Sequence, residues 1–307
     1  MRTLAWVTLT LALLLPGCNR AAQQQAQPSE AVTTAAPTPG VTDAPASEAE
    51  PTSAATTAAP QTQAPEPGGA DVVEAWYVRG GNRGPWVEPE LRPLAAPTVG
   101  VARAAFTEVI TGEPFSPGLS TMAPTGTKVL GVNRKDDLLI LDVSEEIRSV
   151  GTGSAGEIAF AEQLAHTAAQ FPGVRGVRLL VEGEQITDLW GHLDWSSAKE
   201  PDQFAISPVI ISKPEHGASV PAGGVTFNGT ANTFEATVEL RLVNPAGDVV
   251  EKTFTTATCG SGCRGDWTHS FAKVNTPGRW KLIAAESDPS GGEGGGPFTT
   301  ARVFTVQ

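Results

Sequence analysis

The stretch that decides the fold of the first folded region is "GTGSAGEIAFAEQLAHTAAQFPGVRGVRLLVEGE", which runs from Gly151 to Glu184. Its first half is apolar at helical spacing and ends at a Pro-Gly pair, which is a typical helix stop. Its second half alternates, so that one face of a strand carries Val177, Leu179 and Val181. The stretch therefore predicts a helix from Ser154, a turn and a strand, which together form one unit of an α/β domain.

The start of this helix has two interpretations. Ser154 and Glu157 form the S-x-x-E pattern of a capping box, in which each side chain satisfies a free backbone N–H group. Alternatively, the glycine-rich "GTGSAG" could hold an anion on backbone N–H groups, although no P-loop lysine follows it. We expect the capping box. The predicted buried stripe of the helix consists of Ile158, Ala161, Ala165 and Ala168, flanked by Leu164 and Phe171.

The residues before this stretch predict four more extended segments and a helix. Residues 71–80 alternate as a strand does, and residues 86–94 contain two prolines, which suits only a sheet edge. Thr98 can cap a helix that Gly112 ends, and two strands at 127–132 and 137–144 follow it across a polar turn. The buried face predicted for this first helix consists of Ala102, Ala105, Phe106, Val109 and Ile110. Leaving aside the proline-rich segment 86–94, the order is β-α-β-β-α-β, which places two helices on one face of a small sheet.

These segments resemble a known family. "AWYVRGG…WVEPELRPL", "TKVLGVNRKDDLLILDVSEE" and the opening stretch are similar to the GerM-type sporulation and spore-germination domain (GerMN). The resemblance implies an extracytoplasmic α/β module at residues 71–200. Members are similar to ring-building folds that assemble side by side, and the resemblance carries no catalytic residues to this chain.

The second folded region, residues 205–307, consists of seven short strands separated by turns, a pattern typical of an antiparallel β-sandwich. "NPAGD" at residues 244–248 predicts a hairpin between two of them. The Cys…Trp…Cys spacing of antibody domains is absent. "ISKPEHGASVPAGGVTFNGTANTFEATVELRLVNPAGDVV…FTTATCGSGCRGDW" is instead similar to the immunoglobulin-like domain of bacterial spore germination. The two domains commonly occur together in lipoproteins, so each resemblance supports the other. The fold class expected is α+β followed by an all-β immunoglobulin-like sandwich.

The N-terminus has the pattern of an export signal at residues 1–17. The apolar run from Leu4 to Leu15 would form a helix about 18 Å long, which is too short for a hydrocarbon core of roughly 30 Å. "LPGC" follows and resembles the lipobox of bacterial lipoproteins, although Pro16 is unusual there. The resemblance implies that Cys18 carries the lipid and becomes the first residue of the mature chain. The alternative is an ordinary signal peptide with an incidental cysteine.

Residues 18–70 predict a disordered tether. They are rich in Ala, Thr, Pro, Gln and Ser, repeat "TTAAP", and between Asn19 and Ala70 contain no aromatic residue, Leu, Ile or Met. Such a segment cannot bury enough apolar surface to offset the entropy lost on ordering. As a coil it would span about 40 Å, which would hold the folded part away from a membrane. Its Thr, Ser and Pro content could also accept glycans.

Two of the three cysteines, Cys259 and Cys263, lie in "TATCGSGCRGD". They could form a redox pair, part of a metal site or a structural disulfide. A redox pair would need C-x-x-C near a βαβ unit, and a zinc site would need further ligands within the usual spacing. In an exported protein, Gly260 and Gly262 would allow a tight loop, so we expect a disulfide that shapes it. The adjacent "RGD" at residues 264–266 is too short to imply adhesion.

Other candidates for chemistry are few. His192 and Asp194 would share a face if they lay on a strand, but one pair gives too few metal ligands. The remaining histidines, at positions 166, 216 and 269, lie in unrelated contexts. The carboxylates at the end of a predicted strand are Asp142, Glu145 and Glu146, and such groups more often cap or face solvent than catalyse. We therefore predict no catalytic, cofactor-binding or metal-binding residues.

Charge and composition limit the partners. The chain has a net charge of −12 with no basic stripe, which argues against nucleic acid and against direct adhesion to anionic membranes. We expect an extracytoplasmic protein that is lipid-anchored to the bacterial cell membrane through Cys18. It would bind envelope proteins or cell-wall polymer without catalysis and self-associate weakly. The alternative is an enzyme of cell-wall turnover, or an accessory factor to one.

Overall fold

The computed structural model describes residues 70–81, 84–98, 100–149, 152–289, 291 and 296–307. The predicted signal, Cys18 and nearly all of the tether lie outside the described residues. The chain divides into two compact units, and every described residue belongs to the second, Pro60–Gln307. Among the described residues, no helix is both long and apolar enough to span a membrane.

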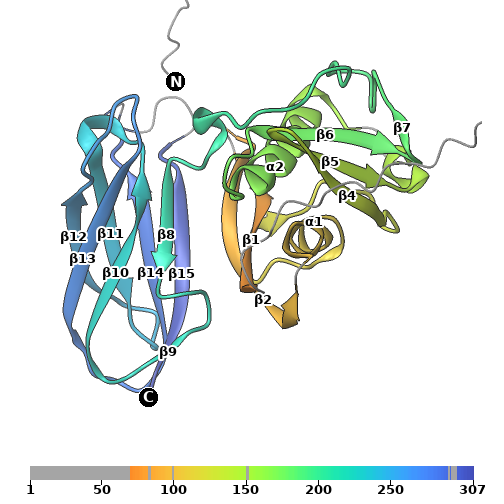
Figure 1. Cartoon of the computed structure of the whole chain (residues 1–307). Coiled ribbons are helices and arrows are strands. Elements are labelled where there is room, and N and C mark those ends of the chain that lie inside the picture. The colour runs from red at the N-terminus through yellow and green to blue at the C-terminus, as the bar shows by residue number, and fades with distance from the viewer. Residues whose placement is uncertain (1–69, 82–83, 99, 150–151, 290, 292–295) are drawn as a thin grey trace, which may run out of the picture. The chain divides into compact units, whose positions relative to one another are not determined.

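The α/β part contains two separate sheets. The first has the order β2-β1-β3 and consists of β1 (Ala70–Arg79), β2 (Trp86–Thr98) and β3 (Leu119–Ser120). The second has the order β4-β5-β6-β7 and consists of β4 (Val129–Lys135), β5 (Leu138–Val143), β6 (Gly176–Val181) and β7 (Glu184–Gln185). The helices α1 (Val101–Thr111) and α2 (Ser154–Ala169) pack against β1 on one side and against β4 and β6 on the other (Figure 1).

This arrangement confirms the order of elements and corrects one expectation. The prediction of two helices on one face of one small sheet is wrong, because the helices lie between two sheets. The reason lies in α2, whose small residues allow backbone to approach from several directions. Even Glu157, Gln163 and Thr167 on this helix are fully buried. A helix buried on several sides needs a second layer to cover it.

The predicted strand and helix faces are largely confirmed. The inward face of β1, Val73, Ala75 and Tyr77, is buried, and β2 lies at the edge of its sheet as its prolines require. The predicted stripe of α1 is buried in full. On α2, however, Ile158 is exposed, while the rest of its predicted stripe is buried except for the partly buried Phe171.

Both predicted helix caps are wrong. The N-cap of α1 is Gly100 and not Thr98, which still belongs to β2. The N-cap of α2 is Gly153, and no side chain caps this helix. In α2, Glu157 of the expected capping box is buried and accepts its hydrogen bonds from a distant loop. Gly112 ends α1 as predicted.

The sandwich contains all seven predicted strands and one short addition. One sheet has the order β13-β10-β8 and consists of β8 (Val209–Lys213), β10 (Gly223–Ala231) and β13 (Gly265–Val274). The other has the order β12-β11-β14-β15-β9 and consists of β9 (Ser219–Val220), β11 (Thr237–Val243), β12 (Val249–Thr256), β14 (Gly278–Glu286) and β15 (Thr299–Val306). Asn244 bonds the backbone of Ala246 and Asp248, which forms the predicted hairpin turn. The aromatic core between the sheets contains Phe227, Trp267, Phe271, Trp280 and Phe304.

Candidate functional site

The cysteine loop is a compact structural feature between β12 and β13. A disulfide joins Cys259 and Cys263, whose Cα atoms are 5.7 Å apart. The loop is held by Asn232, which accepts a hydrogen bond from the Gly262 N–H group at 3.0 Å. At Gly260, a Cβ atom would collide with the backbone of Ala236, so only glycine fits there. The bonded pair thus shapes a loop that packs against the turn before β11.

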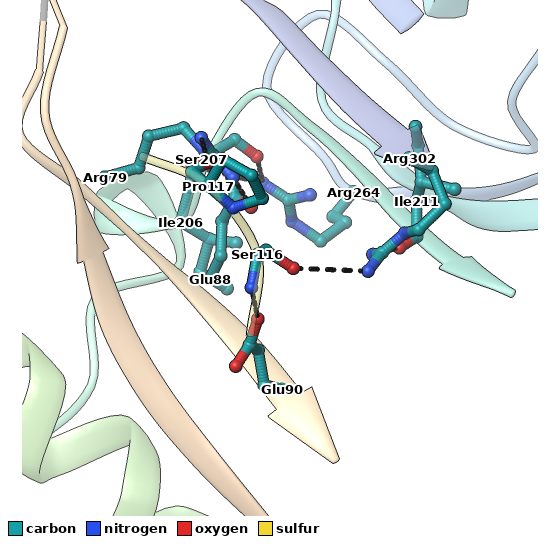
Figure 2. A network of polar contacts seen from close by, with 10 residues as sticks. All are labelled: Arg79, Glu88, Glu90, Ser116, Pro117, Ile206, Ser207, Ile211, Arg264 and Arg302. Carbon is teal, nitrogen blue, oxygen red and sulfur yellow. Dashed lines mark hydrogen bonds and ion pairs between the residues drawn. The ribbon is translucent and has the colours of Figure 1, made fainter. Parts of the chain in front are cut away.

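Arg264, the first residue of "RGD", has a structural role. Its guanidinium donates hydrogen bonds to the carbonyl oxygens of Ile206 and Ser207, the latter at 2.8 Å (Figure 2). It also donates to the Thr230 hydroxyl at 3.1 Å. Burial lowers the pKa of Arg264 to about 10. The guanidinium is therefore committed to the segment that enters the sandwich, and "RGD" does not present it as an adhesion motif.

Glu157 does not form the expected capping box. The side chain is fully buried and accepts hydrogen bonds from the backbone N–H groups of Trp190 and His192 and from the Trp195 indole N–H at 2.8 Å. The carboxylate thus fixes the loop after β7 onto α2. Nothing in the spacing S-x-x-E distinguishes this role from a cap, because the donors come from residues more than thirty positions away.

His192 and Asp194 lie in this same loop and not on a strand. His192 is exposed, and Asp194 accepts a hydrogen bond from the Ser196 N–H group at 2.8 Å. Hydrogen bonds from Ser196, first from its side chain and then from its backbone, lower the pKa of Asp194. Over the residues that the structure describes, no group of three or more His, Cys, Asp or Glu side chains is arranged to hold a metal ion.

The carboxylates after β5 are held by neighbouring groups. Asp142 accepts a hydrogen bond from the Gly183 N–H group at 2.8 Å, and Glu145 pairs with Arg148. A hydrogen bond from Ser144 is the largest cause that lowers the pKa of Glu146. Asp142 lies near the end of β5, and Glu145 and Glu146 lie in the short helical turn that follows it.

A polar network that was not predicted from the sequence joins the α/β part to the sandwich (Figure 2). Arg79 forms a two-pronged ion pair with Glu88, one contact of which is 2.9 Å long, and donates to the Pro117 carbonyl at 3.2 Å. The pair is nearly buried, with side-chain exposures of 12% and 6%. Burial of both charges is tolerated because they satisfy one another. The signal that could have located them is the charged residue at every second position of a strand that is otherwise apolar.

Glu90 and Arg302 continue this network. Glu90 is buried and accepts hydrogen bonds from the N–H groups of Phe115 and Ser116, at 2.8 and 2.6 Å. The Ser116 hydroxyl lies 3.4 Å from Arg302, a residue of β15 that also donates to the carbonyl of Ile211 on β8 (Figure 2). The segment before β3 therefore connects a buried acid of the α/β part to a half-buried arginine of the sandwich.

The fold and these contacts define a class: an α/β domain joined to an immunoglobulin-like sandwich by a partly buried polar network. Two family models match the chain. Residues 80–187 match Germane, described as sporulation and spore germination, and residues 208–293 match Gmad2, the immunoglobulin-like domain of bacterial spore germination. The chain therefore carries a sporulation and spore-germination domain followed by the immunoglobulin-like domain of spore germination.

Several solved structures are similar. The first GerMN domain of the sporulation protein GerM from Bacillus subtilis is 20% identical, with a TM-score of 0.36, over 44% of this chain and 99% of that one. The tandem GerMN domains of the same protein are 19% identical, with a TM-score of 0.37, over 60% of this chain and 58% of that one. A putative lipoprotein from Clostridium perfringens is 22% identical, with a TM-score of 0.31, over 42% and 86% of the two chains. No curated protein matches.

Proposed function

We propose that this chain is a lipid-anchored protein of the bacterial cell envelope that works by binding and assembly, without catalysis. The observation that carries the proposal is the state of the candidate carboxylates. Asp142 accepts a hydrogen bond from the Gly183 N–H group, Asp194 accepts one from the Ser196 N–H group in its own turn, and Glu146 is held by Ser144. Side chains held in this way have a role in the local fold, which supports a protein that works without using them on a substrate.

The direction of the pKa shifts supports the same proposal. A general acid at neutral pH needs a carboxyl pKa that is raised by burial or by a second carboxylate. The pKa values of Asp194 and Glu146 are instead lowered, and hydrogen bonds are the main cause. A cell-wall glycosidase that used one of these groups as its general acid would require that group to be protonated when it acts.

The N-terminal sequence supports the proposed location. The short apolar run, "LPGC" and the tether of residues 18–70 suit a protein whose Cys18 carries a lipid on the outer side of the cell membrane. The lipid would confine copies to a plane and raise their effective concentration. Weak contacts between copies, or with envelope proteins or cell-wall polymer, would then suffice for assembly.

The β2 edge supports weak and not strong self-association. The backbone of this edge is occupied near its start, where the Ser207 N–H group donates to the Val87 carbonyl at 3.1 Å. Further along, Pro89 and Pro93 have no N–H group to offer to another strand. Lateral pairing through this edge is therefore limited, and we expect oligomers mainly where the lipid concentrates the protein.

Two measurements test this function in cells of a lipoprotein-processing host. Wild-type protein should fractionate with membranes and be captured as crosslinked oligomers, whereas Cys18→Ser should lose both properties. Cys259→Ser, a cysteine substitution that leaves the anchor, is the matched control and should stay in the membrane fraction. Equal membrane association and crosslinking of the Cys18 variant would contradict the proposal.

The enzyme alternative is tested with purified protein and peptidoglycan. We expect no soluble muropeptides after prolonged incubation, by liquid chromatography and mass spectrometry. Release of muropeptides that is abolished by Asp142→Asn or Glu146→Gln, and retained by Glu184→Gln, would establish turnover instead. Glu184 is an exposed residue of β7 and controls for the loss of a negative charge.

A further inference from the structure

A cavity of about 240 Å³ lies between β2 and β8. One wall is largely apolar and comes from β2 and the segment after α1, with Pro89, Leu91, Pro93 and Phe115. The opposite wall comes from β8, the turn that follows it, and β15. The polar groups of the lining are Glu74, Glu90, Ser212, Lys213, Glu215, His216 and Arg302.

Arg302 is a cation in the lining of this cavity, and both of its hydrogen-bond partners are neutral groups. Its guanidinium donates to the Ser116 hydroxyl at 3.4 Å and to the Ile211 carbonyl, and its Nε is buried without a hydrogen-bond partner among the described residues. His216 has a similarly buried Nδ1 without a partner in that part of the chain. Arg302 and His216 therefore both line the cavity, and each carries a side-chain nitrogen whose hydrogen-bonding capacity the described residues leave unused.

Most carboxylates of the lining are already compensated. Glu90 is held by two backbone N–H groups and lies 3.5 Å from Arg92, and Glu215 pairs with Lys213. Glu74 belongs to β1 of the α/β part, whereas Arg302 belongs to β15 of the sandwich. The unmatched charge on the sandwich wall is thus positive, and the group that complements it is an anion.

The apolar wall indicates more than a bare anion. Phe115 is 55% exposed, and the Arg92 guanidinium lies 3.6 Å from the centre of its ring. Because the Val87 carbonyl points to the outer edge of β2, strand alternation turns the carbonyls of Pro89, Leu91 and Pro93 to that edge as well. These carbonyls can accept hydrogen bonds from the N–H groups of an extended chain.

We propose that the β2–β8 cavity binds the C-terminal carboxylate of an extended peptide, with Arg302 and His216 on the carboxylate and Phe115 and Leu91 against its last side chains. The peptide is the L-amino-acid C-terminus of a partner protein, because only L residues follow the alternation of β2 in an extended strand. This inference rests on the proposed function in so far as it names the kind of partner for a binding protein.

The test uses the full chain and three N-acetylated tripeptide probes followed by isothermal titration calorimetry. The first is acetyl-Val-Leu-Ala with a free carboxylate, the second is its C-terminal amide, and the third is acetyl-Lys-D-Ala-D-Ala, which has the terminus of a cell-wall peptide. We expect the free acid to bind at least tenfold more tightly than the amide and the D,D-peptide. Inorganic phosphate should not compete with it at equal concentration.

Variants assign the binding to the cavity. Arg302→Gln should weaken binding of the free acid at least tenfold and remove its advantage over the amide. Arg302→Lys should restore part of this advantage, because it returns the charge without the planar fork. Arg241→Gln, a change of the same kind on β11 outside the cavity lining, should leave binding unchanged. Thermal unfolding of each variant checks that the fold is kept.

Several results would overturn the inference. They are failure of the free acid to bind at millimolar concentration, equal binding of acid and amide, equal competition by phosphate, and preference for the D,D-peptide. Loss of crosslinking in the envelope experiment together with retained peptide binding would refute assembly while leaving this site standing. Retained crosslinking without peptide binding would refute the peptide site while leaving assembly standing. The two failures are therefore distinguishable.

Discussion

Glu157 holds a charge inside the α/β core with hydrogen bonds from three donors. Two come from backbone N–H groups of the loop after β7 and the third from the Trp195 indole. Three hydrogen bonds to one carboxylate balance its loss of hydration, because bonds to an ionised group are the strong ones. The residue acts as a fastener between α2 and a loop that has little regular structure of its own.

We therefore expect Glu157→Gln to destabilise the protein markedly. An amide nitrogen would replace one carboxylate oxygen, and it cannot accept a hydrogen bond from the N–H group that it would face. The lost hydrogen bond should lower the free energy of unfolding by about 1–3 kcal/mol. Urea unfolding followed by tryptophan fluorescence measures the loss, since Trp190 and Trp195 both contact this carboxylate. Glu184→Gln, on the exposed strand β7, should change stability by no more than about 0.5 kcal/mol. An unchanged midpoint for Glu157→Gln would refute the role assigned here.

His216 gives the protein a predictable response to acid. Burial, and then the charge of Arg302, lower the pKa of His216 below its ordinary value of 6.5. The unfolded chain therefore takes up a proton at a higher pH than the folded chain does. Stability should fall as the pH drops below about 6.5 and stop falling once the folded pKa has been passed.

The measurement is the free energy of unfolding at a series of pH values between 8 and 4. We expect His216→Gln to lose part of the decrease that the wild type shows below about pH 6.5. His192→Gln, at an exposed position, should follow the wild-type curve. Parallel curves for wild type and His216→Gln would show that this histidine does not titrate differently on folding.

At the scale of elements, the cysteine loop is a short connection held at both ends. Its disulfide closes a loop with a sequence separation of four residues, and hydrogen bonds to Asn232 and Thr233 hold its middle. By chain entropy, closing so small a loop stabilises the fold by only about 2 kcal/mol. The bond thus supports the end of β12 without determining the sandwich.

We expect both cysteines to be oxidised in protein taken from the envelope. Intact mass after thiol labelling, with and without prior reduction, decides this directly. The double variant Cys259→Ser, Cys263→Ser should lower the stability of the sandwich by about 2 kcal/mol and leave the α/β part folded. Two thiols that label freely without reduction would count against the bond, and collapse of both domains would show a larger role than its loop length allows.

At the scale of the whole described unit, the segment around Ile206 is where the two domains are fastened together. Val87 forms an isolated bridge with Ile206, and Arg264 binds the carbonyls of Ile206 and Ser207 from the sandwich side. Removing a buried donor leaves these carbonyls unsatisfied, which costs about 1–3 kcal/mol. We therefore expect Arg264 to contribute much of the stability of the segment that connects the two domains.

Limited proteolysis tests this connection. Arg264→Ala should speed cleavage within residues 200–208 roughly tenfold, because cleavage follows the population of the opened segment. Arg241→Ala, on β11, should be cleaved at the wild-type rate. Fragment masses locate the cut, and an unchanged rate for Arg264→Ala would show that the segment is held by other contacts.

The sequence by itself determined the kinds of element and their order, because periodicity and turn residues act within a few positions. It therefore predicted the stripe of α1, the proline-bearing edge strand β2 and the seven principal strands of the sandwich. It also indicated the loop that the cysteines share, since the glycines that permit this loop lie beside them. Each of these features depends on neighbours along the chain.

Only the tertiary structure decided the partners of the charged residues. Glu157 lies at the right spacing for a cap but binds donors from a distant loop, and Arg264 reads as part of a motif but binds the domain connection. The two-sheet arrangement of the α/β part was likewise hidden, because small residues on several sides of α2 permit a second layer without specifying it. A buried charge without a partner is costly, so each of these residues is hydrogen-bonded in the folded chain. The partners lie far away in the sequence, and only the tertiary structure identifies them.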